Sequence, residues 1–523
     1  MKKKRVLIIV CVALALIYAL SFLFFVLLPD KDIFANGGSL SSVENFSSYE
    51  DFSSYTESLI SDISSITSTE ISSTEQTSSA NSSTTSSAPS ITDSRPASSS
   101  VSSSKPTASS KPVVSSNPTT SSKPTVSSKP VSSSKPSSST STSSTVSTPP
   151  TTNSSFMRAI WIAYYDLDMK GANKATFQKK IDTMFDNAVS MNMTDVICHV
   201  RAFSDAFYYS DIFPHTKYLS GTEGKDPGYD ALEYMVYAAK KRGLKFHAWL
   251  NPYRATFTTD LSKLANNHPA KIWLTDNNTD NDRYVLSAGE KYLYYNPAIP
   301  EVRKLIIDGV KEILDNYDVD AIHIDDYFYP TTAESFDSVE YSAYKAASPN
   351  NKLELADWRR ANVNALVTGI YSTIHNNKYN GVKFGISPAG NIGNCYNKYY
   401  ADVEHWMKTT GFCDYIIPQI YFGYEYKTEK YQFTNLLNEW NSKKKHASLE
   451  FYIGLGPYKI NKPGENDGTE WSNKPEILGK QVTDSYKLGC DGVAIFDYGA
   501  MVKTNDANKK AKKAMVDAFK AIK

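Results

Sequence analysis

The sequence predicts a (β/α)8 barrel, also called a TIM barrel, behind an N-terminal membrane helix and a long linker. Eight short β-rich runs alternate with helix-patterned stretches from residue 156 onward, which is typical of a parallel sheet covered by helices. Glycine or asparagine stands where a helix should end and a strand begin. A doubly wound sheet would usually have fewer strands and a glycine-rich phosphate loop after the first. Residues 165–174 instead read Tyr-Asp-Leu-Asp-Met-Lys-Gly-Ala-Asn-Lys.

Residues 1–30 are predicted to anchor the chain in a membrane. Residues 2–5 are Lys-Lys-Lys-Arg, and residues 6–28 carry no charged side chain. Roughly 20 apolar residues span a bilayer as a helix, and basic residues before the span favour a cytoplasmic N-terminus and an exported remainder. The alternative is a cleaved signal peptide, whose apolar region usually has about 7–15 residues. In that case the protein is secreted.

Residues 31–155 are predicted to be a disordered stalk rich in serine, threonine and proline. In 101–150 these three residue types make up 37 of 50 positions, and Ser-Ser-Lys-Pro recurs along the segment. Such a composition cannot bury enough apolar surface to offset the entropy lost on folding. We therefore expect a semi-extended spacer that carries the globular domain, residues 156–523, away from the membrane.

Composition excludes several classes of function for this domain. The net charge of the chain is +1, so no large basic field invites nucleic acid. A hydrophobic content of 41% is low for a protein with many membrane spans. The cysteines after residue 156 are scattered, without a C-x-x-C motif, so neither a disulfide scaffold nor a cysteine metal site is expected: Cys198, Cys395, Cys413 and Cys490.

The predicted strands are runs of seven or eight residues, rich in β-branched and aromatic side chains. In order, they are 158–165, 195–201, 244–250, 320–326, 382–388, 414–421, 451–457 and 491–498. Apolar residues at helical spacing predict helices at 177–191, 229–242, 300–316 and 357–376. Long insertions at 255–299 and 327–356 follow the third and fourth strands. Both should lie on the C-terminal face of the barrel, where active sites of this fold are built.

Alternation along the strands places polar side chains inside the barrel at these strand ends. In the fourth strand Ile322 and Ile324 should face the helices, which leaves His323 and Asp325 inside. The same reasoning gives an upper layer with carboxylate, guanidinium, amide and aromatic groups, which suits a polyhydroxylated ligand. Its members are Arg201, Trp249, Asn251, Asp325, Gln419 and Tyr421, with Tyr253, Arg254 and Tyr327 around the opening.

Asp325 and Asp326 are the predicted catalytic residues. A glycosidase needs two carboxyl groups beside the scissile bond, one as acid and the other as nucleophile or base. Asp325 is predicted to point inward, and Asp326 begins the next loop. A second carboxylate elsewhere is not fixed by the pattern, and the candidates are Asp166, Asp205, Glu425 and Asp497. Alternatively, the acetamido group of an N-acetyl sugar serves as nucleophile while an Asp orients it.

Three predicted inward histidines raise an alternative chemistry. His199, His247 and His323 fall on neighbouring strands at similar depth, so with Asp325 they would form a zinc site. The competing interpretation is a hydrogen-bonded layer beneath the mouth. The sequence has neither an H-x-H nor an H-E-x-x-H motif to favour metal, so we expect no metal and no other cofactor.

Ordered blocks of the domain resemble the glycosyl hydrolase-like 10 family. They include RAIWIAYYD, HVRAFSDAFYYSDIFP, FHAWLNPYR, DAIHIDDYFYP, VKFGISPAGN and DYIIPQIYF. The resemblance covers nearly all of 156–500 and implies a TIM-barrel fold and glycan hydrolysis outside the cytoplasm. It also implies site positions at 199–201, Trp249, 251–254, 325–327 and Gln419. At the eighth strand the chain has Phe-Asp-Tyr, where a small polar residue between the aromatics is expected, which weakens Asp497 as second carboxylate.

Together these observations predict a membrane-anchored, extracytoplasmic glycoside hydrolase. An anchored stalk favours a substrate close to the cell, so cell-wall glycan, and peptidoglycan in particular, is the expected partner. Two other classes remain open from the sequence: a metal-dependent amidase or deacetylase built on the three histidines, and a non-catalytic glycan-binding protein. The oligomeric state, the linkage cleaved and its stereochemistry are not encoded in these patterns.

Overall fold

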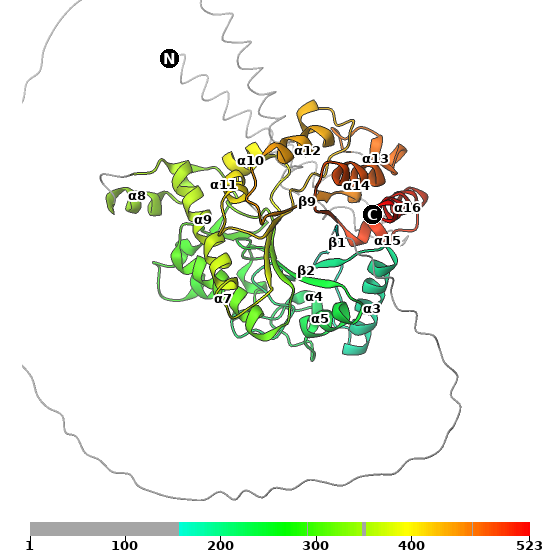
Figure 1. Cartoon of the computed structure of the whole chain (residues 1–523). Helices are drawn as coiled ribbons and strands as arrows, with labels where there is room; N and C mark the ends of the chain where they lie inside the picture. Colours follow the sequence, from blue (N-terminus) through cyan, green and yellow to red (C-terminus); the bar gives the residue numbers. More distant parts are fainter. Residues whose placement is uncertain (1–155, 290, 348–351, 463, 523) are drawn as a thin grey trace, which may run out of the picture. The chain divides into compact units, whose positions relative to one another are not determined.

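Eight parallel strands close into a barrel, as the sequence predicts. Their order around the barrel is β1-β10-β9-β8-β7-β6-β3-β2, and β1 pairs with β10 to complete the ring. Figure 1 shows this closure where the first strand, in cyan, meets the last part of the chain, in red. The strands are β1 Met157–Ile162, β2 Asp195–Arg201, β3 Lys245–Leu250, β6 Ala321–Ile324, β7 Lys383–Ile386, β8 Tyr415–Ile416, β9 Glu450–Leu455 and β10 Gly492–Ile495.

The computed structural model describes residues 156–289, 291–347, 352–462 and 464–522. The predicted membrane helix and the predicted stalk lie outside these residues. None of the helices in the described ranges has both the length and the apolar character needed to cross a bilayer.

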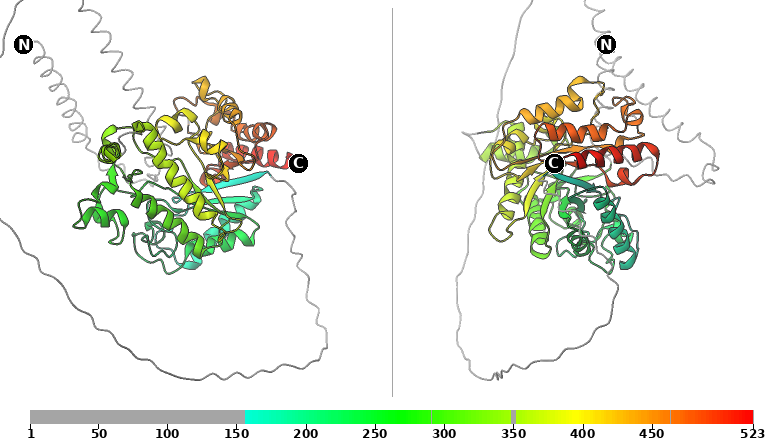
Figure 2. Two further views of the ribbon diagram at one scale, coloured as in Figure 1. Left: turned by 60° about the vertical axis from the view of Figure 1, so that its left-hand side comes forward. Right: turned by 45° about the vertical axis from the view of Figure 1, so that its right-hand side comes forward.

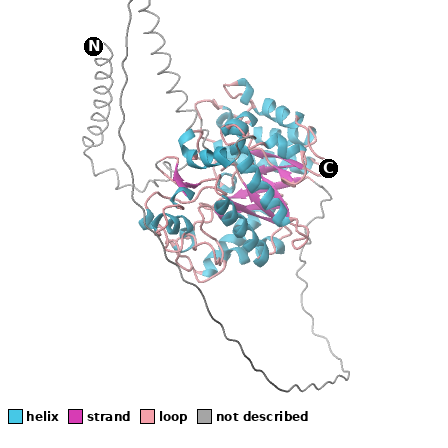
Figure 3. Ribbon diagram, turned by 90° about the vertical axis from the view of Figure 1, so that its left-hand side faces the viewer, coloured by secondary structure: helices cyan, strands magenta, loops and turns pink. Residues whose placement is uncertain are grey.

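Helices follow the strands and surround the barrel (Figure 3). The larger ones are α3 Lys174–Ser190, α5 Ala231–Lys241, α7 Pro300–Asn316, α9 Leu355–Ile374, α12 Phe433–Ser442, α14 Ile477–Lys487 and α16 Asp506–Ala521. Helix α8 Ser338–Ala347 is as long as α12, and the shorter helices are α4 Lys217–Ser220, α6 Pro269–Thr275, α10 Ile392–Asn397, α11 Val403–Lys408, α13 Glu470–Asn473 and α15 Tyr498–Val502. The last helix, α16, packs along α14 (Figure 2).

Strand side chains divide into two apolar clusters according to the predicted alternation. Ile322 and Ile324 of β6 belong to the large cluster between barrel and helices. A smaller cluster fills the barrel interior, and it includes Trp161, Trp249 and Tyr421. The inward and outward faces of β3 and β6 therefore match the sequence prediction, because strict alternation holds along both strands.

Strand β8 is shorter than predicted. It covers Tyr415–Ile416 instead of 414–421, because Pro418 has no amide hydrogen to donate to a neighbouring strand. The backbone continues as single bridges, in which Gln419 pairs with Ala389 on one side and Gly454 on the other. Gln419 is thereby still held at the barrel rim.

The two insertions on the C-terminal face have structures of their own. The first contains an antiparallel hairpin of β4 Val285–Ser287 and β5 Leu293–Tyr295, which the sequence analysis did not predict. The second is tied to α9 by Arg359, which forms an ion pair with Asp337, both side chains being 0% exposed. Arg359 also donates hydrogen bonds to the carbonyl oxygens of Thr332 and Ala333. The loop that follows Asp326 is therefore fixed to the helical layer.

Candidate active site

Asp325 lies at the C-terminal end of β6, inside the barrel mouth, and is only 3% exposed. Its Oδ2 atom accepts hydrogen bonds from the indole Nε1 of Trp249, at 3.0 Å, and from the amide Nδ2 of Asn251. The backbone N–H of Tyr327 donates to Oδ1 at 3.3 Å. Three N–H groups therefore fix this carboxyl group in one orientation.

The pKa values of Asp325 and Asp326 are both raised above their usual range, and to different extents. Burial raises the pKa of Asp325 to about 8, helped by the charge of Asp326 and opposed by Arg254 and the N–H donors. Burial also raises the pKa of Asp326 to about 6, opposed by a hydrogen bond from Gln419 and by Arg254. A pair with separated values supplies an acid and a base at the same pH.

A hydrogen-bonded chain behind Asp325 sets the direction of the Asn251 amide. The Oδ1 atom of Asn251 accepts from His199 Nε2, at 3.2 Å, and from the Arg254 guanidinium, which leaves Nδ2 to donate to Asp325. The backbone N–H of Tyr164 donates to His199 Nδ1 at 3.4 Å, so the ring is neutral with its hydrogen on Nε2. Burial holds the pKa of His199 well below its usual value, in agreement with a neutral ring.

Aromatic rings build the walls of the mouth. The Arg254 guanidinium lies over Phe203 and Tyr327, at 4.2 and 4.4 Å from the ring centroids, and donates to the Tyr327 hydroxyl at 3.1 Å. Tyr292, beside the unpredicted hairpin, and Tyr164 surround the same guanidinium at slightly greater distances. The sequence analysis missed these two rings, although the insertion in which Tyr292 lies was placed on this face.

A second aromatic wall is formed by Tyr421 and Phe496. Their rings stack with centroids 5.4 Å apart, and Trp161 meets both rings edge-on. Gln419 stands next to this wall and donates from Nε2 to the Ser387 carbonyl oxygen at 2.9 Å. The structure thus brings together these predicted site residues: Trp249, Asn251, Arg254, Asp325, Asp326, Tyr327, Gln419 and Tyr421.

Arg201 does not face the barrel interior, and the prediction that it does is wrong. A bulge between His199 and Arg201 shifts the pairing of β2 with β3, so that Arg201 stands opposite the outward residue Leu250. The guanidinium packs at 4.5 Å over the Phe213 ring and against Gly309 of α7, where a Cβ atom would come within 1.9 Å of it. Arg201 therefore joins the helical layer and is not part of the mouth.

Tyr253 is also misplaced by the sequence analysis. Its side chain is fully buried in the cluster between barrel and helices, and its carbonyl oxygen accepts the backbone N–H of Tyr295 at 2.8 Å. The chain turns after β3 so that Asn251 and Arg254 reach the mouth while Tyr253 points the other way. Simple alternation cannot anticipate such a turn.

The four further acids considered as a second carboxylate are all engaged elsewhere. Asp205 is fully buried and accepts the backbone N–H of Phe203, and Glu425 pairs with Lys474 at the surface. Asp497 caps α15 through the N–H of Ala500 and accepts the Tyr165 hydroxyl at 2.8 Å. Burial raises the pKa of Asp166 to about 8, with the charge of Asp497 adding to it. The charge of Asp497 nevertheless acts on the Tyr421 hydroxyl together with those of Asp325 and Asp326, so this acid lies near the same wall of the mouth.

All ring nitrogens of the three inward histidines have hydrogen-bond partners. His247 and His323 share the Tyr415 hydroxyl through Nδ1, at 2.7 and 3.1 Å. Their Nε2 atoms meet Asp195 and Ser387, at 3.0 and 2.9 Å. No group of three metal-binding side chains is assembled within the described ranges. The histidines form a hydrogen-bonded layer under the mouth, which is the second of the two interpretations drawn from the sequence.

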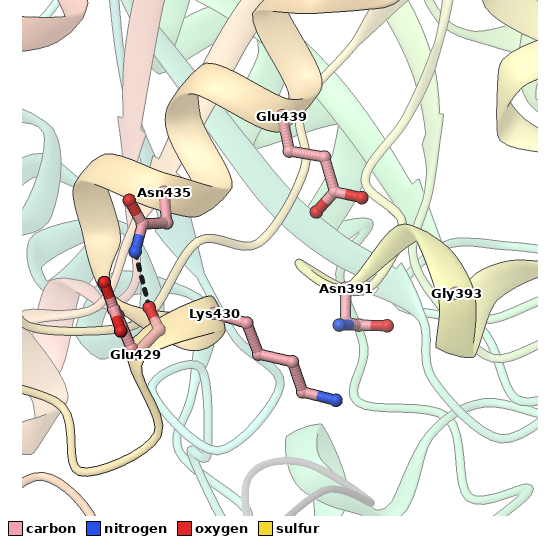
Figure 4. Close-up of a pocket in the computed structure, with 6 residues that line it drawn as sticks. All are labelled: Asn391, Gly393, Glu429, Lys430, Asn435 and Glu439. Carbon is pink, nitrogen blue, oxygen red and sulfur yellow. Dashed lines mark hydrogen bonds between the residues drawn. The ribbon is translucent and has the colours of Figure 1, made fainter.

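An open groove of about 580 Å³ lies outside the barrel mouth, along α10 and α12. Figure 4 shows Lys430, Glu439 and Asn391 pointing toward it. Gly390, next to Asn391, packs against the backbone of Gln419, so the groove adjoins the loop that holds this mouth residue. Its mixed polar lining identifies no particular ligand.

Known proteins resemble this chain along the barrel domain. The sequence profile named glycosyl hydrolase-like 10 matches residues 156–473. Glycosyl hydrolase YngK of Bacillus subtilis is 38% identical over 352 residues, which cover 64% of this chain and 66% of that protein. Glycosyl hydrolase DigH of Escherichia coli K12 is 32% identical over 350 residues, covering 60% of this chain and 76% of that protein. This chain thus spans just under two thirds of the length of YngK and about three quarters of that of DigH.

One solved structure illustrates how distant the structural likenesses are. The glycoside hydrolase domain of PgaB from Bordetella bronchiseptica has 10% identity and a TM-score of 0.45, covering 69% of this chain and 99% of that one. This likeness is too distant to bear on function.

Proposed function

Because this chain belongs to the glycosyl hydrolase-like 10 family, we propose that it hydrolyses glycosidic bonds with Asp325 and Asp326 as its acid and base. One observation carries the proposal. Two adjacent carboxyl groups, Asp325 buried and Asp326 half-buried, lie at the C-terminal mouth of the barrel with raised pKa values, which is where enzymes of this fold work. Protonation of the leaving oxygen by such a pair is the central step of glycoside hydrolysis.

The surroundings of the pair favour a sugar as the ligand. Tyr327 and Tyr421 offer aromatic faces, and Arg254 and Gln419 offer hydrogen-bond donors to hydroxyl groups. Aromatic walls with a few polar groups are typical of small-ligand sites that fix orientation. The residues proposed to hold the sugar are Trp249, Asn251, Arg254, Tyr327, Gln419 and Tyr421.

We further propose that the substrate is the glycan of the cell wall, and that the enzyme acts outside the cytoplasm on a membrane anchor. The uncharged run at 6–28 after four basic residues supports the anchor, and the Ser/Thr/Pro-rich segment supports a spacer that reaches a nearby polymer. Peptidoglycan fits this arrangement better than a diffusible oligosaccharide.

The test uses the 523-residue chain and its Asp325→Asn variant on peptidoglycan glycan strands, with and without attached peptides, in the presence of EDTA. New reducing ends from the wild type alone are expected. Asn keeps the shape of the side chain but cannot exchange a proton, so folding is checked by circular dichroism on both proteins. Absence of products from the wild type, with strands still retained in a pull-down, would instead favour a glycan-binding protein. Dependence on added Zn²⁺ would favour the amidase or deacetylase class.

A further inference from the structure

Two buried carboxyl groups beside the first insertion take no part in the proposed reaction. Asp205, which follows β2, is 0% exposed, and Glu223, which follows α4, is 7% exposed. The Phe203 N–H donates to Asp205 Oδ1 at 3.0 Å, which fixes one side of that carboxyl group. The Ala265 N–H donates to Glu223 Oε2 at 2.8 Å in the same way. The remaining oxygens, Asp205 Oδ2 and Glu223 Oε1, have no hydrogen-bond partner among the residues that the structure describes.

Backbone hydrogen bonds place the segments that carry these two acids on either side of residues 214–216. On one side, the Thr216 N–H donates to the Ala206 carbonyl oxygen at 2.9 Å. On the other side, the Gly224 N–H donates to the His215 carbonyl oxygen at 2.8 Å. A single short stretch of chain therefore separates the backbones of the two acids.

The charges of the two acids act on each other. Burial raises the pKa of Glu223 to about 8, and the charge of Asp205 adds to this effect, while Lys217 and Lys271 oppose it. Burial raises the pKa of Asp205 too, although the Thr216 hydroxyl and the backbone N–H groups of its own loop oppose it. Two carboxyl groups that are buried this close together need a positive charge, or protons, to neutralise them.

A hydroxyl group without a partner lies in the same region. Tyr295, the last residue of β5, is 1% exposed, and its hydroxyl has no hydrogen-bond partner in the described part of the chain. Burial raises the pKa of this hydroxyl, the Ser204 side chain and the Arg201 charge oppose the rise, and the charge of Glu223 adds to it. The Tyr295 hydroxyl therefore lies near Glu223.

Buried charged groups in proteins are paired or bound to a metal ion. Each of these carboxyl groups is held by a backbone N–H on one oxygen and is open on the other, which is how protein chains orient carboxylate ligands. We propose that Asp205 Oδ2 and Glu223 Oε1 bind one calcium ion, with the Tyr295 hydroxyl beside it. The site includes neither Asp325 nor Asp326, so the ion supports the fold and takes no part in proton transfer.

Calcium fits these groups better than other metal ions do. All the atoms of the site are oxygens, which hard cations prefer, whereas structural zinc sites are built from Cys and His. Two carboxylates carry two negative charges, which one divalent ion neutralises. A buried site requires the ion to lose most of its water. Mg²⁺ dehydrates reluctantly, whereas Ca²⁺ accepts irregular sets of protein oxygens at about 2.3–2.6 Å.

The ion would connect the first insertion to the wall of the mouth. Asp205 holds the N–H of Phe203, and the Phe203 carbonyl oxygen lies 3.1 Å from His268 Nε2. The Phe203 ring lies 4.2 Å from the Arg254 guanidinium. An ion that fixes Asp205 therefore also fixes one ring of the aromatic wall, and its removal should weaken sugar binding without stopping hydrolysis.

The experiment measures calcium binding and thermal unfolding of the 523-residue chain after treatment with EDTA and removal of the chelator. Isothermal titration calorimetry should show saturable binding of Ca²⁺ at a single site. The melting temperature should rise with CaCl₂ until this site is filled, because a ligand that binds only the folded state stabilises it. MgCl₂ and NaCl at the same ionic strength should raise the melting temperature much less. Neither readout depends on hydrolysis.

A pair of variants locates the ion. Glu223→Gln keeps the size of the side chain and an acceptor for the Ala265 N–H, but it removes one of the two charges. Its melting temperature in EDTA should equal or exceed that of the wild type, and calcium should no longer raise it. Glu470→Gln is the matched control, because Glu470 is 3% exposed and its Oε2 likewise accepts a backbone N–H, that of Glu425, at 2.9 Å. This variant should keep the full response to calcium.

Two results would overturn the inference. If the wild type binds no calcium and its melting temperature stays unchanged, protons and not a metal ion neutralise the two acids. If Glu223→Gln responds to calcium as strongly as the wild type, the ion binds elsewhere on the chain. The link to the mouth rests on the proposed hydrolase function and has its own readout: EDTA should raise KM for glycan strands more than it lowers kcat, and an unchanged KM would overturn this link.

Discussion

Replacing Trp249 by phenylalanine tests whether the indole N–H sets the proton affinity of Asp325. The indole donates to the Asp325 carboxyl group at 3.0 Å in a buried setting. Phenylalanine keeps an aromatic ring against His199 and removes the donor. Because the donor stabilises the ionised carboxylate, its loss should raise the pKa of Asp325 further.

The size of the shift follows from the strength of the hydrogen bond. A hydrogen bond to a charged group contributes about 1.5–3 kcal/mol, and one pKa unit corresponds to about 1.4 kcal/mol. The pKa of Asp325, which is about 8 in the wild type, should therefore rise by roughly 1–2 units. The pKa of Asp326, about 6, should change little because its hydrogen bond comes from Gln419.

The assay is the pH dependence of kcat/KM, which reports the free enzyme. The singly protonated pair should be active between about 6 and about 8 in the wild type. In Trp249→Phe the alkaline limb should move upward and the acidic limb should stay. Trp161→Phe serves as the matched control, because Trp161 lies in the same interior cluster and does not donate to Asp325.

The reasoning is refuted by either of two results. An alkaline limb that stays in place in Trp249→Phe would mean that the indole N–H does not act on the titrating group. An equal shift in Trp161→Phe would mean that lost packing, and not the lost donor, is responsible.

Three further predictions concern stability. Gly309→Ala should destabilise the fold by about 1–3 kcal/mol, because its Cβ would come within 1.9 Å of the Arg201 guanidinium. Urea unfolding measures the loss of stability, and an unchanged midpoint would contradict the placement of Arg201. Arg359→Met should lower the free energy of unfolding by about 3–5 kcal/mol, because it leaves Asp337 buried without its ion pair. The same urea unfolding assay applies. The double variant Arg359→Met with Asp337→Leu should recover part of the lost stability. Asp166→Asn should gain stability relative to the wild type as pH rises. The pKa of Asp166 is raised to about 8 in the folded state against about 3.9 in the unfolded state, so the wild type loses stability between these values. The difference between the two proteins should grow by at most about 1.4 kcal/mol per pH unit, and a constant difference between pH 5 and pH 7.5 would contradict it.

The strands of the barrel could be predicted because their signals are local. Runs of β-branched residues between helical segments place β2, β3 and β6 within one or two residues of their bounds in the structure. The inward direction of Trp249 and Asp325 follows from alternation alone, which holds along β3 and β6. The position of the carboxyl pair at the end of β6 could therefore be predicted from the sequence, and its catalytic role stays a prediction.

The parts that were missed depend on backbone irregularities and on contacts between distant segments. The bulge in β2 turns Arg201 toward the helical layer. The residue types at 199–201 give no sign that a bulge lies there. Tyr253 is turned away by the chain path after β3. The hairpin that brings Tyr292 to Arg254 has strands of only three residues, too short to show alternation. Whether an acid such as Asp497 is free or engaged depends on partners such as Tyr165, which lies 332 positions away in the chain.

The placement of Asp325 and Asp326 on consecutive residues has a mechanical consequence. Acids on different strands change their separation when the strands move, whereas the Cα atoms of these two residues are joined by one peptide unit, whose geometry hardly varies. Thermal motion of the chain at the end of β6 therefore moves the backbone of both acids together. What such motion alters is the distance from the pair to the wall formed by Tyr421 and Phe496, so heat or pressure should affect the binding of the sugar before it affects the exchange of protons.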